Sequence, residues 1–472
     1  MELIQFGHIF YFGTMITPFE LELLWKEKGE IIESGIDTFP ECLIFILCVL
    51  IPYSSLIFGY IKKYTKKGLY ITSIIIMCMF ISLAKRAMKE KEKIGSFMPR
   101  NDIVSIYNTL NAFSGLLNRI YFSSDREINI KKYEPYTVKN INLPADEINV
   151  VIIMGESDNP YHMSLFGYER HTTPKLDKRA MKDKNFIYKQ ALSSGVFTSV
   201  STTMFFNIQR EPDNIIHTST QPVHLFKLAK KNDFTTVYIS SQDIGIARGI
   251  VTSDTDISQT REYAPLLQER KGDLSMIERL EDMYGKLGKR NFIVLHQRNI
   301  HSPYEKRYKN FPMFDKWQNK ITDSREQKLC NTYDNAMLLN DNFIDNVISY
   351  FEKKTDKPTY IFWIPDHSEL LGKNGKFGHG FLDIEVAKIP FIATIVNGKD
   401  EKFKSQLSYM FTPTHYEIGK VIANLLGFEI INPNEKDGIF FINGTVINGE
   451  AGWIEIDKSD KKTLKTKNIH PL

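Results

Sequence analysis

The sequence predicts an α/β domain in which a mainly parallel sheet is flanked by helices, and three observations support it. Apolar runs rich in β-branched residues recur after residue 145, and polar segments with helical spacing separate them. This alternation is typical of a parallel sheet covered on both faces. Two of the runs end directly in ionisable side chains, as expected at the carboxyl edge of a sheet, where ligands bind. The runs are VVIIM, TTVYIS, NFIVLHQ, TYIFWIP and IPFIATIV.

Composition sets the bounds of this prediction. A chain of 472 residues, 42% hydrophobic and 25% charged, can form one large α/β domain plus a smaller element, and it is not disordered. The formal net charge of +4 is small, and the lysines are spread along the chain, which argues against a nucleic-acid partner. Three of the four cysteines lie in apolar runs, so no disulfide framework is available to the polar part.

The first hundred residues (1–100) are expected to form a membrane or interfacial region. Residues 42–60 and 69–84 carry no charge, and each approaches the roughly 20 residues that cross a bilayer. A pair of core helices is the alternative. The loop between the two runs carries four lysines, which predicts a cytoplasmic loop and places the chain after Lys85 outside.

The segments on either side of these spans are expected to be helical. Residues 3–16 are apolar and aromatic but short for a span, which favours an interfacial helix on the outer leaflet. Residues 101–144 are expected to include a connector helix, and residues 145–472 to form the catalytic domain.

Two strand ends carry the side chains of a metal site. Glu156 follows VVIIMG, and Gly155 allows the sharp turn that presents its carboxylate. Asp366 and His367 follow TYIFWIP, and an ionisable pair directly after a buried strand needs a partner or a metal. Carboxylates and an imidazole suit a divalent cation, whereas a solvated loop is the alternative.

A cluster of hydroxyl groups is the candidate nucleophile. Seven Ser and Thr residues lie within residues 191–207, around Gly195, where a loop runs into a predicted helix. Free backbone N–H groups at such a helix start stabilise phosphate, and a metal-bound hydroxyl is a competent nucleophile. An ordinary capped helix start is the alternative.

The motifs occur in an order that resembles a known family. GES is followed by SLFGYERHTTPKLD, SSGVFTSVSTTMF, VLHQRNIHSPYEKRY, YDNAMLLND and IPDHSELLGKNGKFGHG. Between about residues 149 and 427 the chain resembles the bacterial phosphoethanolamine transferases of the alkaline phosphatase/sulfatase superfamily. The set is specific, although no single motif is.

The resemblance implies a role for each motif residue. Glu156 is similar to a zinc-ligating glutamate, and Asp366 and His367 match the zinc-ligating Asp-His pair. Thr198 falls where the family has the threonine that becomes phosphoethanolaminylated, and it would be the fourth ligand. The other implied residues, which bind substrate phosphate or a second zinc or lie near the substrate, are His301, His379 and Glu369.

The implied chemistry is consistent with these residue types. Zinc accepts a tetrahedral site of oxygen and nitrogen ligands, and the oxygen-rich set leaves manganese open. A hydroxyl with its pKa lowered by the metal could attack a phosphodiester, giving a covalent phospho-threonine and ping-pong transfer. The implied partners are phosphatidylethanolamine as donor, lipopolysaccharide as acceptor and the bacterial inner membrane, with the catalytic domain in the periplasm and a monomer expected.

Departures from the family pattern concern the acceptor. Asn159 stands where relatives usually have arginine, and Ser194 and Met204 replace the cysteines that flank the nucleophile loop in many lipid A modifying members. The missing cysteines favour the core heptose over lipid A. Glu20, in TPFE, is a candidate contact to the donor head group. An added amine would weaken the attraction of cationic peptides such as polymyxin.

Three rival functions share the fold. A sulfatase would need a C/S-x-P-x-R sequence, which does not occur. A phosphoglycerol transferase would use the same metal and threonine with another lipid head group, so it remains open. A catalytically silent membrane scaffold is the third alternative, although the nucleophile and the ligands are all present.

Overall fold

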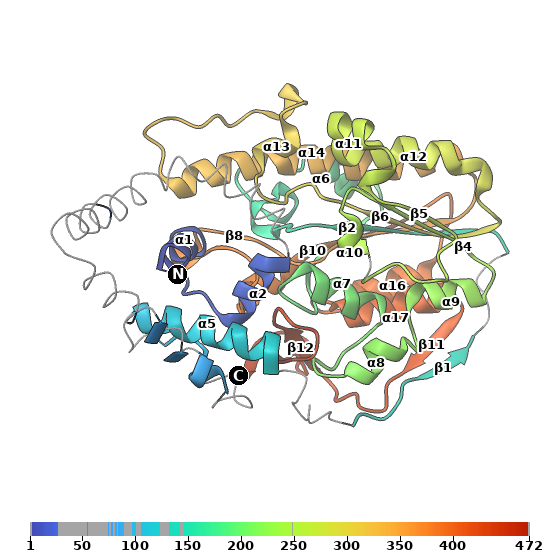
Figure 1. Cartoon of the computed structure of the whole chain (residues 1–472). Helices are drawn as coiled ribbons and strands as arrows, with labels where there is room; N and C mark the ends of the chain where they lie inside the picture. The colour runs from blue at the N-terminus through green and yellow to red at the C-terminus, as the bar shows by residue number, and fades with distance from the viewer. Residues whose placement is uncertain are drawn as a thin grey trace. The chain divides into compact units, whose positions relative to one another are not determined.

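The computed structural model describes residues 2–26, 54, 74, 77–78, 81–82, 84–88, 97–100, 105–122, 132–141, 146–247 and 249–470. The chain divides into two compact units (Figure 1), one of residues 1–129, 374–378 and 471–472 and one of residues 130–373 and 379–470. The predicted spans 42–60 and 69–84 lie almost entirely outside the described residues. Among the helices that are described, none is both long enough and apolar enough to cross a membrane.

The N-terminal unit contains helices whose apolar side chains point outward. It comprises α1 (Glu2–Phe12), α2 (Pro18–Lys26), α5 (Ser105–Phe122) and β9 (Phe377–Gly378). α5, which lies within the predicted connector, buries five polar side chains, Asn108, Thr109, Asn111, Ser114 and Asn118, and exposes four large apolar ones, Ile106, Tyr107, Ile120 and Tyr121. α1 likewise buries Gln5 and exposes Leu3, Ile4 and Phe6. This distribution is the reverse of that in a water-soluble helix.

The second unit, of residues 130–373 and 379–470, is built on a seven-stranded sheet with the strand order β3-β10-β7-β2-β6-β4-β5. The prediction of a mainly parallel sheet is confirmed, because only β10 runs antiparallel, to both β3 and β7. The strands are β2 (Ile148–Gly155), β3 (Ile187–Leu192), β4 (Thr235–Ser240), β5 (Ile257–Gln259), β6 (Arg290–His296), β7 (Thr359–Pro365) and β10 (Lys388–Val396).

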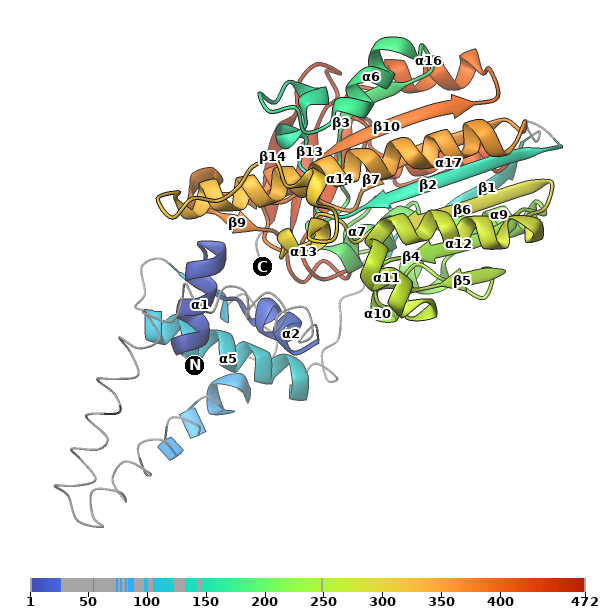
Figure 2. The same cartoon turned by 90° about the horizontal axis from the view of Figure 1, so that it is seen from above.

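Helices lie on both faces of this sheet (Figure 1), and Figure 2 looks down on one of the two covered faces. The residues of β2 alternate between two hydrophobic clusters, since Val150 and Ile152 join one and Val151 and Ile153 the other. The first cluster is shared with α7 (Thr198–Phe206), α9 (Leu225–Lys231), α16 (Glu401–Tyr409) and α17 (His415–Leu425). The second is shared with α6 (Pro174–Lys182), α12 (Ser275–Met283) and α14 (Arg325–Lys354). The remaining short elements are α8 (Ile215–Thr220), α10 (Ile244–Ala247), α11 (Pro265–Lys271), α13 (Glu305–Tyr308), α15 (Ile384–Ala387) and β8 (Leu370–Leu371).

Two smaller antiparallel sheets complete the unit. β1 (Thr137–Asn140) pairs with β11 (Phe428–Ile431), and β12 (Ile439–Asn443), β13 (Trp453–Asp457) and β14 (Lys465–His470) form a three-stranded sheet. Asn443 at the end of β12 donates its N–H to the Ser194 carbonyl (2.8 Å) and accepts from the Val196 N–H (3.1 Å). The C-terminal sheet therefore supports the loop that precedes the candidate nucleophile.

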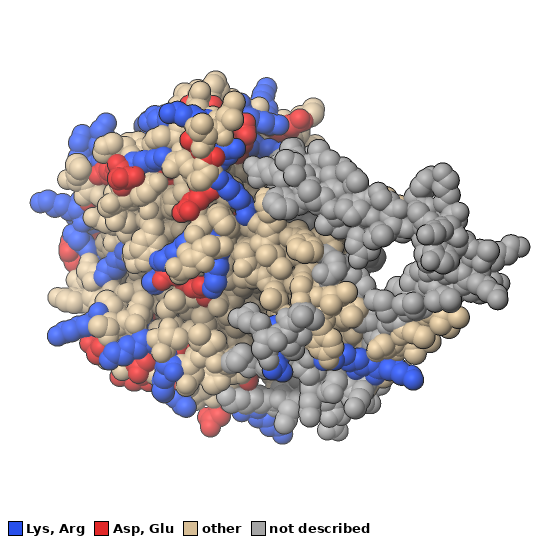
Figure 3. Space-filling view, turned by 90° about the vertical axis from the view of Figure 1, so that its left-hand side faces the viewer, with Lys and Arg blue, Asp and Glu red and all other residues tan. Residues whose placement is uncertain are grey.

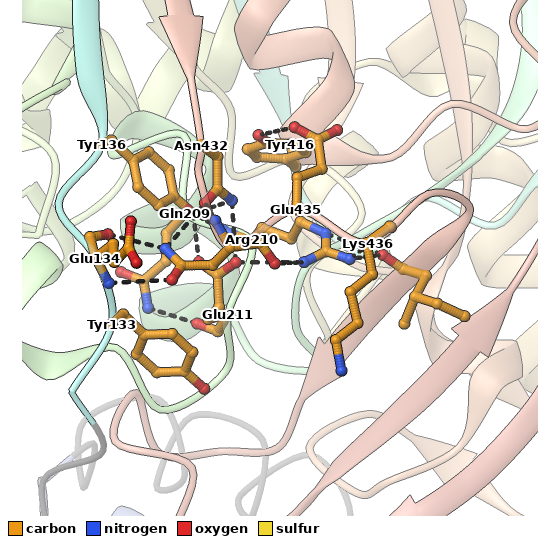
Figure 4. A network of polar contacts seen from close by, with 12 residues as sticks. Tyr133, Glu134, Tyr136, Gln209, Arg210, Glu211, Tyr416, Asn432, Glu435 and Lys436 are labelled. Atoms are coloured by element: carbon orange, nitrogen blue, oxygen red, sulfur yellow. Dashed lines mark hydrogen bonds and ion pairs between the residues drawn. The ribbon is translucent and has the colours of Figure 1, made fainter.

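A buried polar network fastens the start of this unit to its interior (Figure 4). The Arg210 guanidinium donates to the carbonyls of Ile439 and Lys436. The Glu211 carboxylate accepts from the Tyr136 hydroxyl and from Asn432 Nδ2. Because Arg210 and Glu211 are both almost fully buried, these bonds hold the segment before β1 against the loops after α7 and β11.

Charged side chains are distributed over the visible surface. In Figure 3, Lys and Arg side chains are interspersed with Asp and Glu where the surface is not grey, and they do not form one basic region. This view agrees with the spread of lysines along the sequence and the low net charge of +4.

Candidate active site

The register of two central strands brings the predicted ligands together. β2 and β7 pair in parallel with Gly155 opposite Pro365, so Glu156 and Asp366 leave adjacent strands at the same edge. A Cβ at Gly155 would lie 2.4 Å from Asp158 Oδ2, so a larger residue here would displace the Asp158 carboxylate. Glu156 and Asp366 are both almost fully buried.

Glu156, Asp366 and His367 form a compact set of ligand atoms, all within 4.8 Å of one another. His367 Nε2 lies 3.7 Å from Glu156 Oε1 and 3.3 Å from Asp366 Oδ2. His367 Nδ1 donates to the Ser368 carbonyl (3.1 Å), which leaves the Nε2 lone pair directed at the carboxylates. Asp366 Oδ2 is buried and has no hydrogen-bond partner among the described residues. An orphaned buried carboxylate oxygen beside an imidazole lone pair fits a divalent cation.

Thr198 joins this set as the first residue of α7. Its Oγ1 lies 3.1 Å from His367 Nε2, and the residue is 7% exposed. Of the seven hydroxyl-bearing residues between 191 and 207, Thr198 is thus the one that the structure places against His367. The donor set of two carboxylates, one imidazole and one hydroxyl is of a type that zinc accepts and that manganese also tolerates.

Electrostatics within the set favour a bound cation. Burial and the charge of Asp366 raise the pKa of Glu156 to about 8, and burial raises the pKa of Asp366 to about 6. Burial, together with the charge of His379, lowers the pKa of His367 well below its usual value, so His367 is neutral and available as a ligand. Such perturbed groups clustered at a sheet edge are typical of functional sites.

Three further predicted residues lie beside the set. The His379 ring centroid is 4.1 Å from that of His367, and His379 Nδ1 is 3.6 Å from Glu369 Oε2. Burial opposes the charge on His379, but Glu369, Glu156 and Asp366 together raise its pKa to about 9, so its imidazolium persists at neutral pH. The His301 ring is 6.4 Å from that of His379. Two imidazoles are therefore in place to interact with a phosphate.

Asn159 connects two loops of the site. Its Nδ2 donates to the Glu369 carbonyl (2.9 Å), and its Oδ1 accepts from the Tyr161 N–H (2.9 Å). Both ends of the amide are therefore engaged within the protein, and the side chain fixes the Glu369 loop relative to the Glu156 loop.

Glu20 belongs to the N-terminal unit. It lies near the start of α2, where its Oε2 accepts from the Thr17 N–H (2.6 Å) and lies 3.6 Å from His8 Nε2. Burial raises the pKa of Glu20. The carboxylate is thus held by a neighbouring backbone group and an imidazole.

Two supporting residues were missed by the sequence reasoning. Gln242, just after β4, donates from Nε2 to Glu156 Oε2 (2.8 Å) and to the Gln297 carbonyl (2.9 Å). The sequence signal was available, because SSQD is a polar run directly after the strand TTVYIS. Polar groups that hydrogen-bond to metal ligands fix the orientation of those ligands.

His415, the other missed residue, bridges the two halves of the site. Its Nδ1 accepts from the Ser194 N–H (3.2 Å) and its Nε2 donates to the Pro365 carbonyl (2.9 Å). It therefore links the nucleophile loop to the strand that carries the Asp-His pair. The sequence around His415, THYE, indicates only a helix start, which the structure confirms as a capping box at Thr414.

Comparisons with known proteins place the chain in a family. The sulfatase family model matches residues 148–392. Among curated proteins, phosphoethanolamine transferase EptA of Helicobacter pylori is 26% identical over 288 residues, which is 59% of this chain and 53% of the relative. Phosphoethanolamine transferase EptC of Escherichia coli K12 is 26% identical over 231 residues, 47% of this chain and 39% of the relative. The chain thus spans about half the length of the curated relatives it matches, or less.

Solved structures show the same fold. The soluble domain of lipooligosaccharide phosphoethanolamine transferase A from Neisseria meningitidis matches with a TM-score of 0.52 and 22% identity, covering 62% of this chain and 94% of that one. The integral membrane protein EptA of the same organism matches with a TM-score of 0.59 and 18% identity, covering 89% of this chain and 81% of that one. The periplasmic domain of EptC from Escherichia coli, solved in complex with zinc, has a TM-score of 0.53 and 20% identity, covering 67% and 94%. With the family model matching half of its length, this chain belongs to the sulfatase family.

Proposed function

We propose that this chain transfers phosphoethanolamine from phosphatidylethanolamine to lipopolysaccharide, with Thr198 as the nucleophile. The observation that carries the proposal is the Thr198 hydroxyl, 3.1 Å from His367 Nε2 in a buried set of carboxylates with an orphaned oxygen. An ordinary capped helix start does not require buried carboxylates and an imidazole beside its first hydroxyl group. The names of the relatives support the transferred group, and a further relative named Kdo(2)-lipid A phosphoethanolamine 7''-transferase supports an acceptor in lipopolysaccharide.

The proposed chemistry assigns each step to a residue of this chain. Glu156, Asp366, His367 and Thr198 would hold one zinc ion, which when bound lowers the pKa of the threonine hydroxyl. Thr198 Oγ1 forms a bond to phosphorus, and the ester bond to diacylglycerol breaks. His301 or His379 supplies the proton that the departing alkoxide takes up. An acceptor hydroxyl then attacks phosphorus and gives its proton to the same histidine, and Thr198 leaves with its oxygen.

His379 also has an electrostatic role in this proposal. Its imidazolium, sustained by Glu369, lies where it stabilises the charge of the phosphate as it moves between donor and threonine. His301, whose Nδ1 donates to the Ser302 carbonyl (2.6 Å), presents its other nitrogen with a fixed tautomer. A second metal at these two histidines would be an alternative to this role, since an imidazole must be neutral to bind a metal.

The outward-facing apolar side chains of α1 and α5 support a membrane location. A helix that buries asparagines and exposes isoleucine and tyrosine suits a lipid environment rather than water. We assign the chain to the bacterial inner membrane, with its catalytic unit in the periplasm, where the donor lipid and lipopolysaccharide are accessible.

Mass spectrometry of lipopolysaccharide from cells that express the chain tests the proposal. Mild acid separates lipid A from the core, and we expect phosphoethanolamine on a core heptose, absent in cells that express Thr198→Ala. Phosphoethanolamine on lipid A, with lower polymyxin sensitivity, would identify lipid A and not the core heptose as the acceptor. A phosphoglycerol adduct would favour a phosphoglycerol transferase, and an unmodified acceptor would contradict the proposal.

A further inference from the structure

We propose that residues 309–323, here called the edge loop, dock the catalytic unit onto a lipid bilayer that carries anionic head groups. The inference rests on the proposed function in one respect, because a donor embedded in a bilayer must reach the carboxyl edge of the sheet. The surface itself is identified by its position, its exposed side chains and its internal bonds.

The topology places the edge loop at the same edge of the sheet as the candidate site. β6 ends at His296 and α14 begins at Arg325. Since β6 is parallel to β2 and β7, the chain between β6 and α14 leaves the sheet where Glu156 and Asp366 lie. Figure 1 shows this segment joining α13 to the start of α14.

The edge loop exposes apolar and basic side chains together. Ile321 is 100% exposed and Met313 is 67% exposed. Lys309, Lys316 and Lys320 are exposed as well, and within the described residues none of the three ammonium groups is paired with a carboxylate. Large apolar groups kept in water beside unpaired lysines are the combination that an anionic bilayer surface accepts.

The acidic side chains of the edge loop accept hydrogen bonds from neutral groups. Asp315 Oδ1 accepts from Asn335 Nδ2 (3.0 Å), and Asp323 Oδ2 accepts from the Lys320 N–H (2.8 Å). Three lysines against two aspartates leave the edge loop with a net charge of +1. The surface is therefore weakly cationic and apolar.

Hydrogen bonds hold the edge loop in one shape and connect it to the site. Asn335 Oδ1 accepts from the N–H groups of Lys316 and Trp317 (2.9 and 3.0 Å). At the base of the loop, Arg307 Nε donates to the His301 carbonyl (2.8 Å). A bilayer bound by the loop would consequently lie next to a predicted substrate histidine.

A second surface of similar composition provides a matched control. Met181, at the end of α6, is 84% exposed, and Lys178, Lys182 and Lys184 around it are exposed too. α6 leads into β3, which runs parallel to β2, so this surface lies at the opposite, amino edge. Composition does not distinguish the two surfaces, whereas their position relative to the site does.

The test uses the full chain in lipid nanodiscs, with Cys42, Cys48, Cys78 and Cys330 replaced by alanine. An environment-sensitive dye is attached at Ile321→Cys or, as the control, at Met181→Cys. Brominated phosphatidylcholine in the disc should quench the dye at position 321 and leave that at 181 unchanged. Phosphatidylglycerol in the disc should increase the quenching.

Charge removal gives the second arm of the test. Replacing Lys309, Lys316 and Lys320 by glutamine should weaken docking about 100-fold, since each lysine near an anionic surface contributes about 1 kcal/mol. The same change at Lys178, Lys182 and Lys184 should have no effect. Equal quenching at positions 321 and 181, or none at 321, would overturn the proposal.

A water-soluble donor lipid distinguishes failure of the docking proposal from failure of the proposed transferase function. The edge-loop lysine variant should still form the Thr198 adduct with a short-chain, water-soluble phosphatidylethanolamine, and should form it more slowly from nanodisc lipid. Quenching at 321 with no adduct from any donor would retain the docking surface and contradict the transferase. Equal loss of adduct from both donors would overturn the assignment of the lysines to docking.

Discussion

Replacing Glu156 by glutamine should stabilise the metal-free chain and abolish its response to zinc. Burial, followed by the charge of Asp366, raises the pKa of Glu156 from 4.5 to about 8. Because this folded-state pKa lies above the unfolded value, the stability that the protonated carboxyl contributes is complete below pH 4.5. It is lost as pH rises toward 8.

The expected magnitude follows from the pKa and the hydrogen bonds. The rise from 4.5 to about 8 corresponds to about 5 kcal/mol, at about 1.36 kcal/mol per pH unit. A glutamine amide cannot accept from both Ser157 Oγ and Gln242 Nε2, so one hydrogen bond of about 1 kcal/mol is lost. The net gain of about 4 kcal/mol at pH 8 corresponds to about 6 °C in Tm for a unit of about 340 residues.

Thermal melting of chelator-treated protein at pH 5 and pH 8, with and without zinc, is the assay. The wild type should melt at a lower temperature at pH 8 than at pH 5, and zinc at 100 times its Kd should raise the Tm at pH 8 by about 4 °C. Glu156→Gln should melt higher than the wild type without zinc and show no zinc effect. Glu147→Gln, an exposed change at the other end of β2, is the control. A Glu156→Gln protein that melts lower at pH 8, or that zinc stabilises as it does the wild type, would refute the reasoning.

Three further changes have defined outcomes. Burial lowers the pKa of His224 to about 3, and because this folded-state pKa lies below the unfolded value of 6.5, stability is lost as pH falls below 6.5. The loss of unfolding free energy on going to pH 5 should therefore be about 2 kcal/mol smaller in His224→Phe than in the wild type. Equal losses in chemical denaturation would contradict this. Gln242→Leu removes a donor to Glu156, and chelator competition should show 10- to 100-fold weaker zinc binding, whereas unchanged affinity would exclude the role. His415→Phe leaves the Ser194 N–H and Pro365 carbonyl unpaired. The free energy of unfolding in urea should fall by about 2 kcal/mol, and adduct formation on Thr198 should be slower. A normal adduct rate would show that the bridge is dispensable.

The strands that carry the site could be predicted because their apolar runs end in chemistry-bearing side chains. Glu156 and Asp366 were expected at one edge, and the pairing of Gly155 with Pro365 confirms that they are adjacent. The direction of β10 could not be predicted, since IPFIATIV has the composition of a buried parallel strand. Its antiparallel direction is a property of the tertiary fold, which the composition of a single strand does not contain.

The nucleophile and its supports show where the sequence is insufficient. Seven hydroxyl-bearing residues satisfy the pattern between 191 and 207, and the resemblance together with the 3.1 Å contact to His367 distinguishes Thr198. Gln242 lies in a polar run after a strand and His415 at a helix start, and neither pattern identifies a contact to the site. Their roles depend on distances between residues far apart in the chain, which sequence patterns do not contain.

Intact-mass spectrometry of the purified chain after incubation with phosphatidylethanolamine tests the central claim most directly. The account predicts an added phosphoethanolamine group that maps to Thr198, persists at a lower level in Thr198→Ser and is absent in Thr198→Ala. An adduct from phosphatidylglycerol alone would contradict the assignment of the donor. An adduct on another residue, or none from either lipid, would contradict the assignment of Thr198 as the nucleophile.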